Sequence, residues 1–181
     1  MILPPATILT PHRIEIGAGV LIFENASFSL VEEFRGRRHQ PSLRIGDGTL
    51  IGHGAWFSCV GRIEIGDHVL IGHNVLIADS FHEYAAVGTP VFHQPMAEPR
   101  TVRVGDGAIL GPGAAVLSGA TIGPGAYVAA NAVVAGEVPA HAVAAGNPAE
   151  VIRRWDAGRE TWVDSPDPRW GAVLATLTRD P

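Results

Sequence analysis

The sequence is poor in charge, contains a single cysteine and has no long apolar run. Of its 181 residues 17% are charged, and 13 basic against 18 acidic side chains give a formal net charge of −5. Basic residues never occur in runs longer than two, which argues against a nucleic-acid-binding surface. No segment reaches the roughly 18 apolar residues of a membrane span, and the N-terminal residues lack the pattern of a signal peptide. We therefore expect a cytoplasmic protein with no membrane span, and Cys59 alone cannot form an internal disulfide.

Glycine and proline are abundant instead, with 22 Gly and 14 Pro in a chain that is 46% apolar. This composition is typical of a globular, turn-rich chain rather than a disordered one. The glycines follow a six-residue period that is set by aliphatic residues. These aliphatic positions are Ile16, Ile22, Ile45, Ile51, Ile65, Ile71, Val104, Leu110, Val116, Ile122, Val128 and Val134. Three residues after ten of these twelve stands Gly or Asn, the residues that most readily adopt left-handed backbone angles.

A period of six fits neither a helix nor a simple alternating strand, and it predicts a short strand followed by a tight turn, repeated. One repeat cannot bury its own apolar side, so successive repeats must stack and enclose the aliphatic residues. With three hexads in each coil, five coils begin at Ile16, Ile45, Ile65, Val104 and Ile122. The fold class is therefore all-β, a parallel β-helix roughly 24 Å tall at ~4.8 Å per paired strand.

The hexads, the interruption after Ile77 and the segment Ala145–Ala149 (AGNPA) resemble those of the hexapeptide-repeat acyltransferases. The resemblance covers about residues 16–162 and is closest to the sugar and polysaccharide O-acetyltransferases of the lipopolysaccharide and colanic-acid type. It implies a left-handed β-helix, a homotrimer with active sites between subunits, acetyl-CoA as the acyl donor and no metal. We divide the chain into a β-helix domain at 1–147, with a loop insertion at 79–101, and a C-terminal helical cap or tail at 148–181.

Two segments interrupt the period: a charged one at residues 28–44 and a loop rich in proline and aromatic residues at 79–101. Long loops in compact domains are usually functional or disordered, and the second loop leaves directly after a regular hexad. The resemblance implies that His82, within Asp79-Ser-Phe-His82, is the general base. An imidazole suits this role because its ordinary pKa lies near neutrality. We expect Asp79 to orient the His82 ring.

The remaining site predictions concern the acceptor and the donor. Four residues in or near the loop are candidates for acceptor binding: Ser58, Tyr84, His93 and Gln94. The resemblance implies that the pantetheine arm of coenzyme A binds at Gly111, Pro112, Ala130, Ala135, Gly136 and Arg153. The chain departs from the family where Trp is common at Ile109, Thr-Lys at Ala135-Gly136, and Lys or Arg at Glu150. The last two departures remove basic partners for the coenzyme phosphates.

The C-terminal residues show the signals of a helix start. Asn147 as N-cap, Pro148 and Glu150 have capping-box spacing, and they predict a helix that ends near Trp155. A second short helix is expected from Asp167-Pro168 onward.

The leading hypothesis is an acetyl-CoA-dependent O-acetyltransferase that acts on a sugar or glycan hydroxyl by direct attack. An N-acyltransferase for an amino sugar or amino acid is the alternative, followed by a non-catalytic β-helix scaffold. A γ-type carbonic anhydrase, which shares the fold, needs a phased His-x4-His pair. His53 has the right phase, but Ser58 stands five residues later, and the pair His68 and His73 is out of phase.

Overall fold

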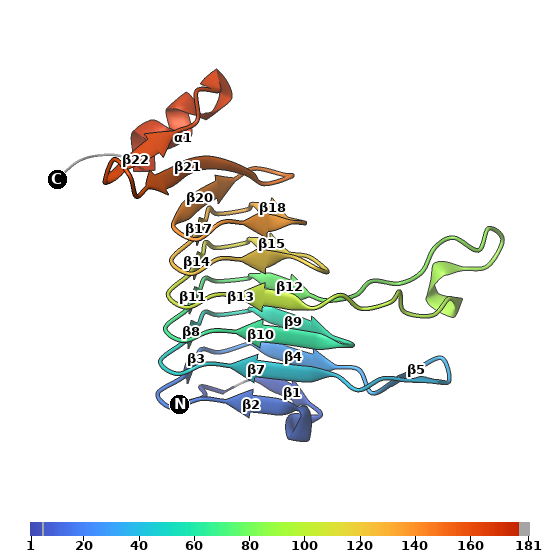
Figure 1. The fold of residues 1–181 in the computed structure, drawn as a ribbon. Helices are drawn as coiled ribbons and strands as arrows, with labels where there is room; N and C mark the ends of the chain where they lie inside the picture. The colour runs from blue at the N-terminus through green and yellow to red at the C-terminus, as the bar shows by residue number, and fades with distance from the viewer. Residues whose placement is uncertain (5, 178–181) are drawn as a thin grey trace.

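The computed structural model describes residues 1–4 and 6–177, which form a stack of three-sided coils (Figure 1). Within each coil the chain visits three parallel sheets in turn, which we call sheets 1, 2 and 3. Sheet 1 contains β2 (Ile14–Ile16), β7 (Ser42–Ile45), β10 (Arg62–Ile65), β13 (Val102–Val104), β16 (Thr121–Ile122) and β19 (Glu137–Val138). Sheet 2 contains β3 (Leu21–Ile22), β8 (Leu50–Ile51), β11 (Leu70–Ile71), β14 (Ile109–Leu110), β17 (Tyr127–Val128) and β20 (Ala142–Ala145), followed by β21 (Glu150–Asp156) and β22 (Thr161–Asp164). Sheet 3 contains β1 (Thr7–Leu9), β4 (Ser27–Leu30), β9 (Trp56–Cys59), β12 (Leu76–Ala78), β15 (Ala115–Val116) and β18 (Val133–Val134).

The five predicted coils are confirmed. Their starting residues Ile16, Ile45, Ile65, Val104 and Ile122 pair one above the other in sheet 1. Beyond the fifth coil, β19 and β20 add part of a sixth.

The third side of the first coils uses aromatic residues that the aliphatic pattern missed. Phe28 and Phe57 occupy the interior of sheet 3, where their rings stack at a centroid distance of 4.9 Å and an interplanar angle of 9°. Ile77 lies next in the same interior column, paired with Phe57. The two stacked rings fill the volume that two aliphatic side chains fill elsewhere.

The turns have the predicted backbone. Left-handed angles occur at eleven of the twelve turn positions: Gly19, Asn25, Gly48, Gly54, His68, Asn74, Gly107, Gly113, Gly119, Gly125 and Asn131. The twelfth, Glu137, is instead part of strand β19.

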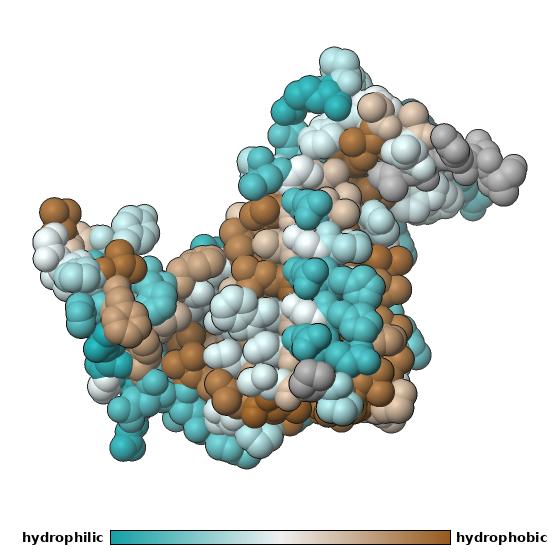
Figure 2. Space-filling view, turned by 180° about the vertical axis from the view of Figure 1, so that it is seen from behind, coloured by the Kyte–Doolittle hydropathy of each residue, from teal (hydrophilic) through white to brown (hydrophobic). Residues whose placement is uncertain are grey.

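The outward faces of the sheets differ in chemistry. Sheet 1 carries a charge ladder, Glu15, Arg44, Glu64 and Arg103, in which Arg103 and Glu64 form an ion pair at 2.9 Å. Sheet 2 carries an apolar column instead: Leu21, Leu50, Leu70, Ile109, Tyr127 and Val143. On sheet 3 the outward residues include Trp56, Leu76, Ala115 and Val133. Figure 2 shows such alignment of like residues in columns along the stack.

The helix predicted from Pro148 to Trp155 is wrong, because β21 occupies these residues and pairs antiparallel with both β20 and β22. Strand β20 offers an unpaired edge, and the β-branched Val151 and Ile152 favour its extension over a helical turn. Ile152 is fully buried, with Ala145 and Leu174 in a small second core.

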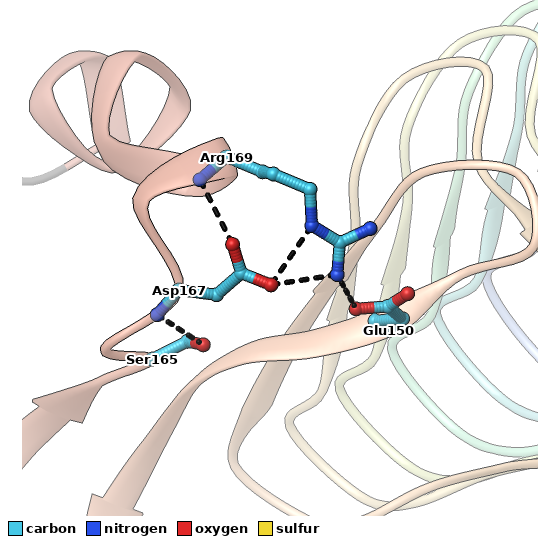
Figure 3. A network of polar contacts seen from close by, with 4 residues as sticks. All are labelled: Glu150, Ser165, Asp167 and Arg169. Carbon is cyan, nitrogen blue, oxygen red and sulfur yellow. Dashed lines mark hydrogen bonds and ion pairs between the residues drawn. The ribbon is translucent and has the colours of Figure 1, made fainter.

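The second predicted helix is confirmed, as η3 (Pro168–Trp170) and α1 (Gly171–Leu177). Asp167 caps its start by accepting from the Arg169 amide at 2.9 Å. Figure 3 shows Arg169 joining Asp167 to Glu150, with contacts of 2.6 and 3.0 Å, so Glu150 ties β21 to the terminal helix. No helix in the described ranges has the length and hydropathy to cross a membrane.

Candidate active site at one corner of the helix

Both interruptions leave the β-helix at the corner where the chain passes from sheet 3 to sheet 1. Residues 31–41, which contain the hairpin of β5 (Glu33–Phe34) and β6 (Arg37–Arg38), connect the first coil to the second. Residues 79–101, with the short helix η2 (Val91–His93), connect the third coil to the fourth. The intervening coil turns this corner tightly through Val60 and Gly61. Figure 1 shows hairpin and loop projecting on the same side.

The hairpin and the loop contact each other and form one lobe, which we call the corner lobe. Arg35 donates from Nε to the carbonyl of Phe92 at 3.0 Å and lies over the Phe92 ring at 4.4 Å. The ring of Phe34 meets the His82 imidazole edge-on at a centroid distance of 5.1 Å. The charged first interruption thus supplies one wall beside the predicted base.

The two ends of the loop pair with each other and form a neck. His82 and Met96 form an antiparallel bridge, and the amide of Glu83 donates to the carbonyl of Pro95 at 2.9 Å. Ser80 adds a hydroxyl bond to the carbonyl of Ala97 at 2.6 Å. The backbone of His82 is therefore held by neighbours, while its side chain is exposed.

Asp79 is fully buried at the base of this neck, and its carboxylate does not contact His82. Its two oxygens accept from the amides of Val60 and Gly61, each at 2.8 Å. Its backbone carbonyl accepts from the Ser118 hydroxyl at 2.6 Å. Among the described residues no hydrogen bond joins Asp79 to His82, so the expected orienting contact is absent. Asp79 instead fixes the loop exit to the coils on either side.

Cys59 lies beside Asp79 and is fully buried. Burial, together with the nearby Asp79 charge, raises the pKa of the Cys59 thiol to about 12. A thiol with this pKa is almost entirely protonated at neutral pH, and only the thiolate is a good nucleophile. This agrees with direct transfer to the acceptor rather than an acyl-cysteine.

The four predicted acceptor residues have different environments. Tyr84 and His93 are exposed in the corner lobe, and Ser58 is half-buried on β9. Gln94 is buried, and its side chain bonds to the backbone of Ala86 and to the Thr89 carbonyl at 2.8 Å. Gln94 thus holds the tip of the loop together, and its amide is not free for an acceptor.

The predicted donor residues divide between two corners and one sheet face. Gly111, Pro112 and Ala130 lie at the corner between sheets 2 and 3, where Gly111 packs so closely on the next coil that a Cβ would lie 2.6 Å from the Ala130 nitrogen. Ala135 and Gly136 follow β18, at the same corner as Asp79 but two coils further along.

Arg153, on β21, lies on the outer face of sheet 2. It forms an ion pair with Asp164 at 2.9 Å and lies 5.5 Å from the Trp162 ring. With Tyr127 and Trp162 it borders a hollow of about 410 Å³.

The sequence pattern did not identify Phe34, Val60, Gly61 or Ser118 as parts of the site. Each lies about one or two coils from Asp79 or His82 in the chain. The signal that could have found the backbone partners is the coil length, which places residues 60–61 directly below residue 79 at the same corner. Within the described part of the chain no three His, Cys, Asp or Glu side chains are grouped as a metal site.

Known proteins resemble both the sequence and the fold. The family described as bacterial transferase hexapeptide (six repeats) matches residues 101–136. A probable acetyltransferase of Mycobacterium tuberculosis, Rv3034c, is 31% identical over 163 residues, which are 83% of this chain and 54% of that protein. Serine acetyltransferase 2 of Arabidopsis thaliana is 37% identical over 125 residues, 69% of this chain and 35% of the relative. The chain thus spans about a third to a half of these relatives.

Two solved structures share the architecture. A hexapeptide-repeat acetyltransferase of Vibrio cholerae, VCA0836, solved with acetyl coenzyme A, superposes with a TM-score of 0.65 at 26% identity, covering 81% of this chain and 74% of that one. A maltose O-acetyltransferase of Clostridium difficile gives 0.58 at 25% identity, covering 78% and 66%. The similarity confirms the predicted left-handed parallel β-helix. By its repeat, its three-sided coils and these matches, the chain is a left-handed β-helix of hexapeptide repeats, similar to the hexapeptide-repeat transferases.

Proposed function

We propose that this protein transfers an acetyl group from acetyl-CoA to a hydroxyl group of a sugar or glycan precursor, with His82 as the general base. The observation that carries the proposal is the placement of His82, whose backbone is fixed in the neck while its imidazole is exposed between hairpin and loop. The solved relatives support it, since one was crystallised with acetyl coenzyme A and another is named a maltose O-acetyltransferase.

In this reaction the His82 imidazole takes the proton of the acceptor hydroxyl as its oxygen forms a bond to the thioester carbonyl carbon. The C–S bond then breaks, and the imidazolium returns the proton to the departing thiolate, so that no net proton is gained or lost. General-base assistance of this kind contributes about 10²–10⁴-fold to the rate. Phe34, against the ring, limits the orientations that the imidazole can adopt.

The donor positions fit a pantetheine arm through their backbone. No hydrogen bond within the described residues uses the amides of Ala130, Ala135 or Gly136, and a Cβ on Gly136 would meet no atom within 4 Å. These open amides can donate to the carbonyl groups of the arm. Arg153 is the basic residue we assign to the coenzyme phosphates, although Asp164 already neutralises part of its charge.

We further propose a homotrimer in the cytoplasm, with each active site between two subunits. The outward faces of sheets 2 and 3 support the trimer, because they expose apolar side chains that water would otherwise contact. Trp56 is 53% exposed and Leu70 43% exposed. Contiguous exposed apolar surface of this kind is typical of an interface.

A second acceptor class deserves a test because several relatives are named serine acetyltransferases. A hydroxyl amino acid needs the same base and the same thioester, so the same His82 chemistry applies. An amine acceptor, as in an N-acyltransferase, would depend less on His82 because an amine is the stronger nucleophile.

The experiment measures thiol release from acetyl-CoA with maltose, L-serine and glucosamine as acceptors. His82→Ala should lower kcat with a hydroxyl acceptor by about 10²–10⁴-fold, without lowering Tm. His12→Ala, an exposed histidine paired with Glu32, is the matched control and should keep full activity. Wild-type rates in His82→Ala would refute the role of His82 as general base. If no acceptor caused thiol release and coenzyme A did not bind, the proposed acetyltransferase activity would be refuted.

A further inference from the structure

A hollow of about 450 Å³ opens in the corner lobe between the hairpin and the neck of the loop. Residues 37–40 form one wall, residues 96–99 form the other, and the tight turn of Val60 and Gly61 lies between them. The three segments come from three successive turns of the chain around the same corner. The hollow therefore exists only because the two interruptions face each other across a short turn.

The hollow has an excess of positive charge in an acidic protein. The net charge of the chain is −5, and all 13 of its basic residues are arginine. Arg37 and Arg38 border the hollow, and neither forms an ion pair with any described residue. By contrast, Arg35 of the same hairpin is engaged by Phe92. Among the described residues, Glu98 is the one acidic side chain that borders the hollow.

A third nitrogen-bearing side chain, His39, belongs to the same wall. His39 borders the hollow, and its Nε2 is buried without a hydrogen-bond partner in the described structure. Its backbone is fixed, since its amide donates to the carbonyl of Glu32 at 2.8 Å. A buried polar atom without a partner costs free energy, so this side of the hollow carries an unsatisfied group.

The hollow adjoins the predicted base by two routes. Met96, on one wall, forms the antiparallel bridge with His82. On the other side Phe34, whose ring meets the His82 imidazole, pairs across the hairpin with Arg37. A molecule whose hydroxyl reaches His82 can therefore place a second group in the hollow.

We propose that this hollow binds an oxyanion of the acceptor, a phosphate or a carboxylate, and so selects anionic over neutral hydroxyl acceptors. The inference rests on the proposed function and narrows its substrate class. Arginine suits the task because its guanidinium binds phosphate and carboxylate oxygens through paired hydrogen bonds. No acyl transfer occurs in the hollow itself, which positions the acceptor for His82.

A binding experiment tests the hollow without any acyl donor. Inorganic phosphate and acetate are titrated calorimetrically into the wild type and into the double variant Arg37→Gln/Arg38→Gln. We expect saturable binding of one of the two anions, weakened about tenfold or more in the double variant because charge-assisted bonds are lost. The double variant Arg154→Gln/Arg159→Gln, which removes two exposed arginines of the C-terminal hairpin, one of them paired with Asp156, is the charge-matched control and should bind like the wild type.

A variant that should tighten anion binding distinguishes a specific effect from misfolding, because a misfolded protein would only lose binding. Glu98→Gln removes the negative charge at the hollow and should tighten binding of the same anion. Absence of binding to the wild type, or equal binding in the double variant, would overturn the proposal. The preferred anion also decides between phosphate and carboxylate.

The second arm compares acceptors with and without an anionic group: glucose 6-phosphate with glucose, and glycerate with glycerol. The wild type should show a lower KM for the anionic member of one pair, and the double variant should lose that preference while kcat is unchanged. Equal KM values within both pairs would overturn the inference while leaving the transferase intact. Failure of the transferase would instead appear as no thiol release with any of the four acceptors, whatever the calorimetry shows.

Discussion

Replacing Asp79 tests whether this residue holds the loop exit or orients His82, the proposed general base. In Asp79→Ala the amides of Val60 and Gly61 lose the carboxylate oxygens to which they donate at 2.8 Å. A buried donor left without a partner costs about 1–3 kcal/mol. The Val60 bond is fully buried and the Gly61 bond partly so, and we therefore expect the two losses together to destabilise the fold by about 3–5 kcal/mol.

At roughly 2–4 °C per kcal/mol for a chain of this size, Tm should fall by about 6–20 °C. The assay is thermal unfolding followed by circular dichroism, at equal protein concentration for all variants. Asp67→Ala is the matched control, because its carboxylate also accepts from a backbone amide of a neighbouring coil, Asp47, but is exposed. Water can replace that bond, so the control should lose less than about 1 kcal/mol.

Asp79→Asn separates the two roles. The amide keeps one acceptor oxygen but turns an NH2 group toward the second donor, so we expect a loss of about 1–3 kcal/mol. If Asp79 instead acted by orienting His82, this variant would keep its Tm and lose kcat. Equal Tm values for Asp79→Ala and Asp67→Ala would refute the anchoring argument.

Three further outcomes follow from local geometry. Burial and the adjacent Asp79 carboxylate raise the pKa of Cys59 to about 12, so its thiol should resist iodoacetamide at pH 8 until the protein unfolds. Because the thiol of the unfolded chain ionises near pH 9, the contribution of Cys59 to stability is complete below pH 9 and is lost as the pH rises toward 12. Alkaline denaturation of the wild type and of Cys59→Ala measures this loss. Gly48→Ala should destabilise by about 1–2 kcal/mol in urea, since φ is +64° and a Cβ would overlap the His68 imidazole, and an unchanged midpoint would contradict this. Arg35→Ala should speed proteolysis of the loop at residues 84–92 without changing Tm, because the hairpin loses its contacts to Phe92, and equal cleavage rates would show that these contacts do not hold the lobe.

The stack could be predicted from the sequence because its constraints are local and periodic. An aliphatic residue every sixth position and a left-handed turn residue three positions later fix the register of each coil, and the pairing of Ile45, Ile65 and Val104 follows that register. The pattern missed Phe28 and Phe57 because stacked rings replace aliphatic side chains where two neighbouring coils change together.

The C-terminal error has a different cause. The capping pattern at Asn147 and Glu150 describes a helix start that is valid for an isolated segment. The unpaired edge of β20 offers ladder hydrogen bonds that an isolated segment lacks, and Ile152 becomes fully buried in the resulting sheet. Tertiary pairing therefore outweighed local propensity, which rarely exceeds several tenths of a kcal/mol per residue.

The site lies at one corner because a β-helix accepts insertions only where strand pairing is not interrupted. Leu76 and Ile77 pair with the coils on both sides, and Val102 resumes that pairing directly after the loop. The ends of the insertion are thus fixed, while its length is free. Two insertions at the same corner, separated by one tight turn, must lie against each other, and this juxtaposition brings Phe34 of the hairpin against the His82 ring. Both insertions can be seen in the sequence. Their contact can be predicted only once the coils are stacked, because the stack shows that both insertions leave at the corner between sheets 3 and 1.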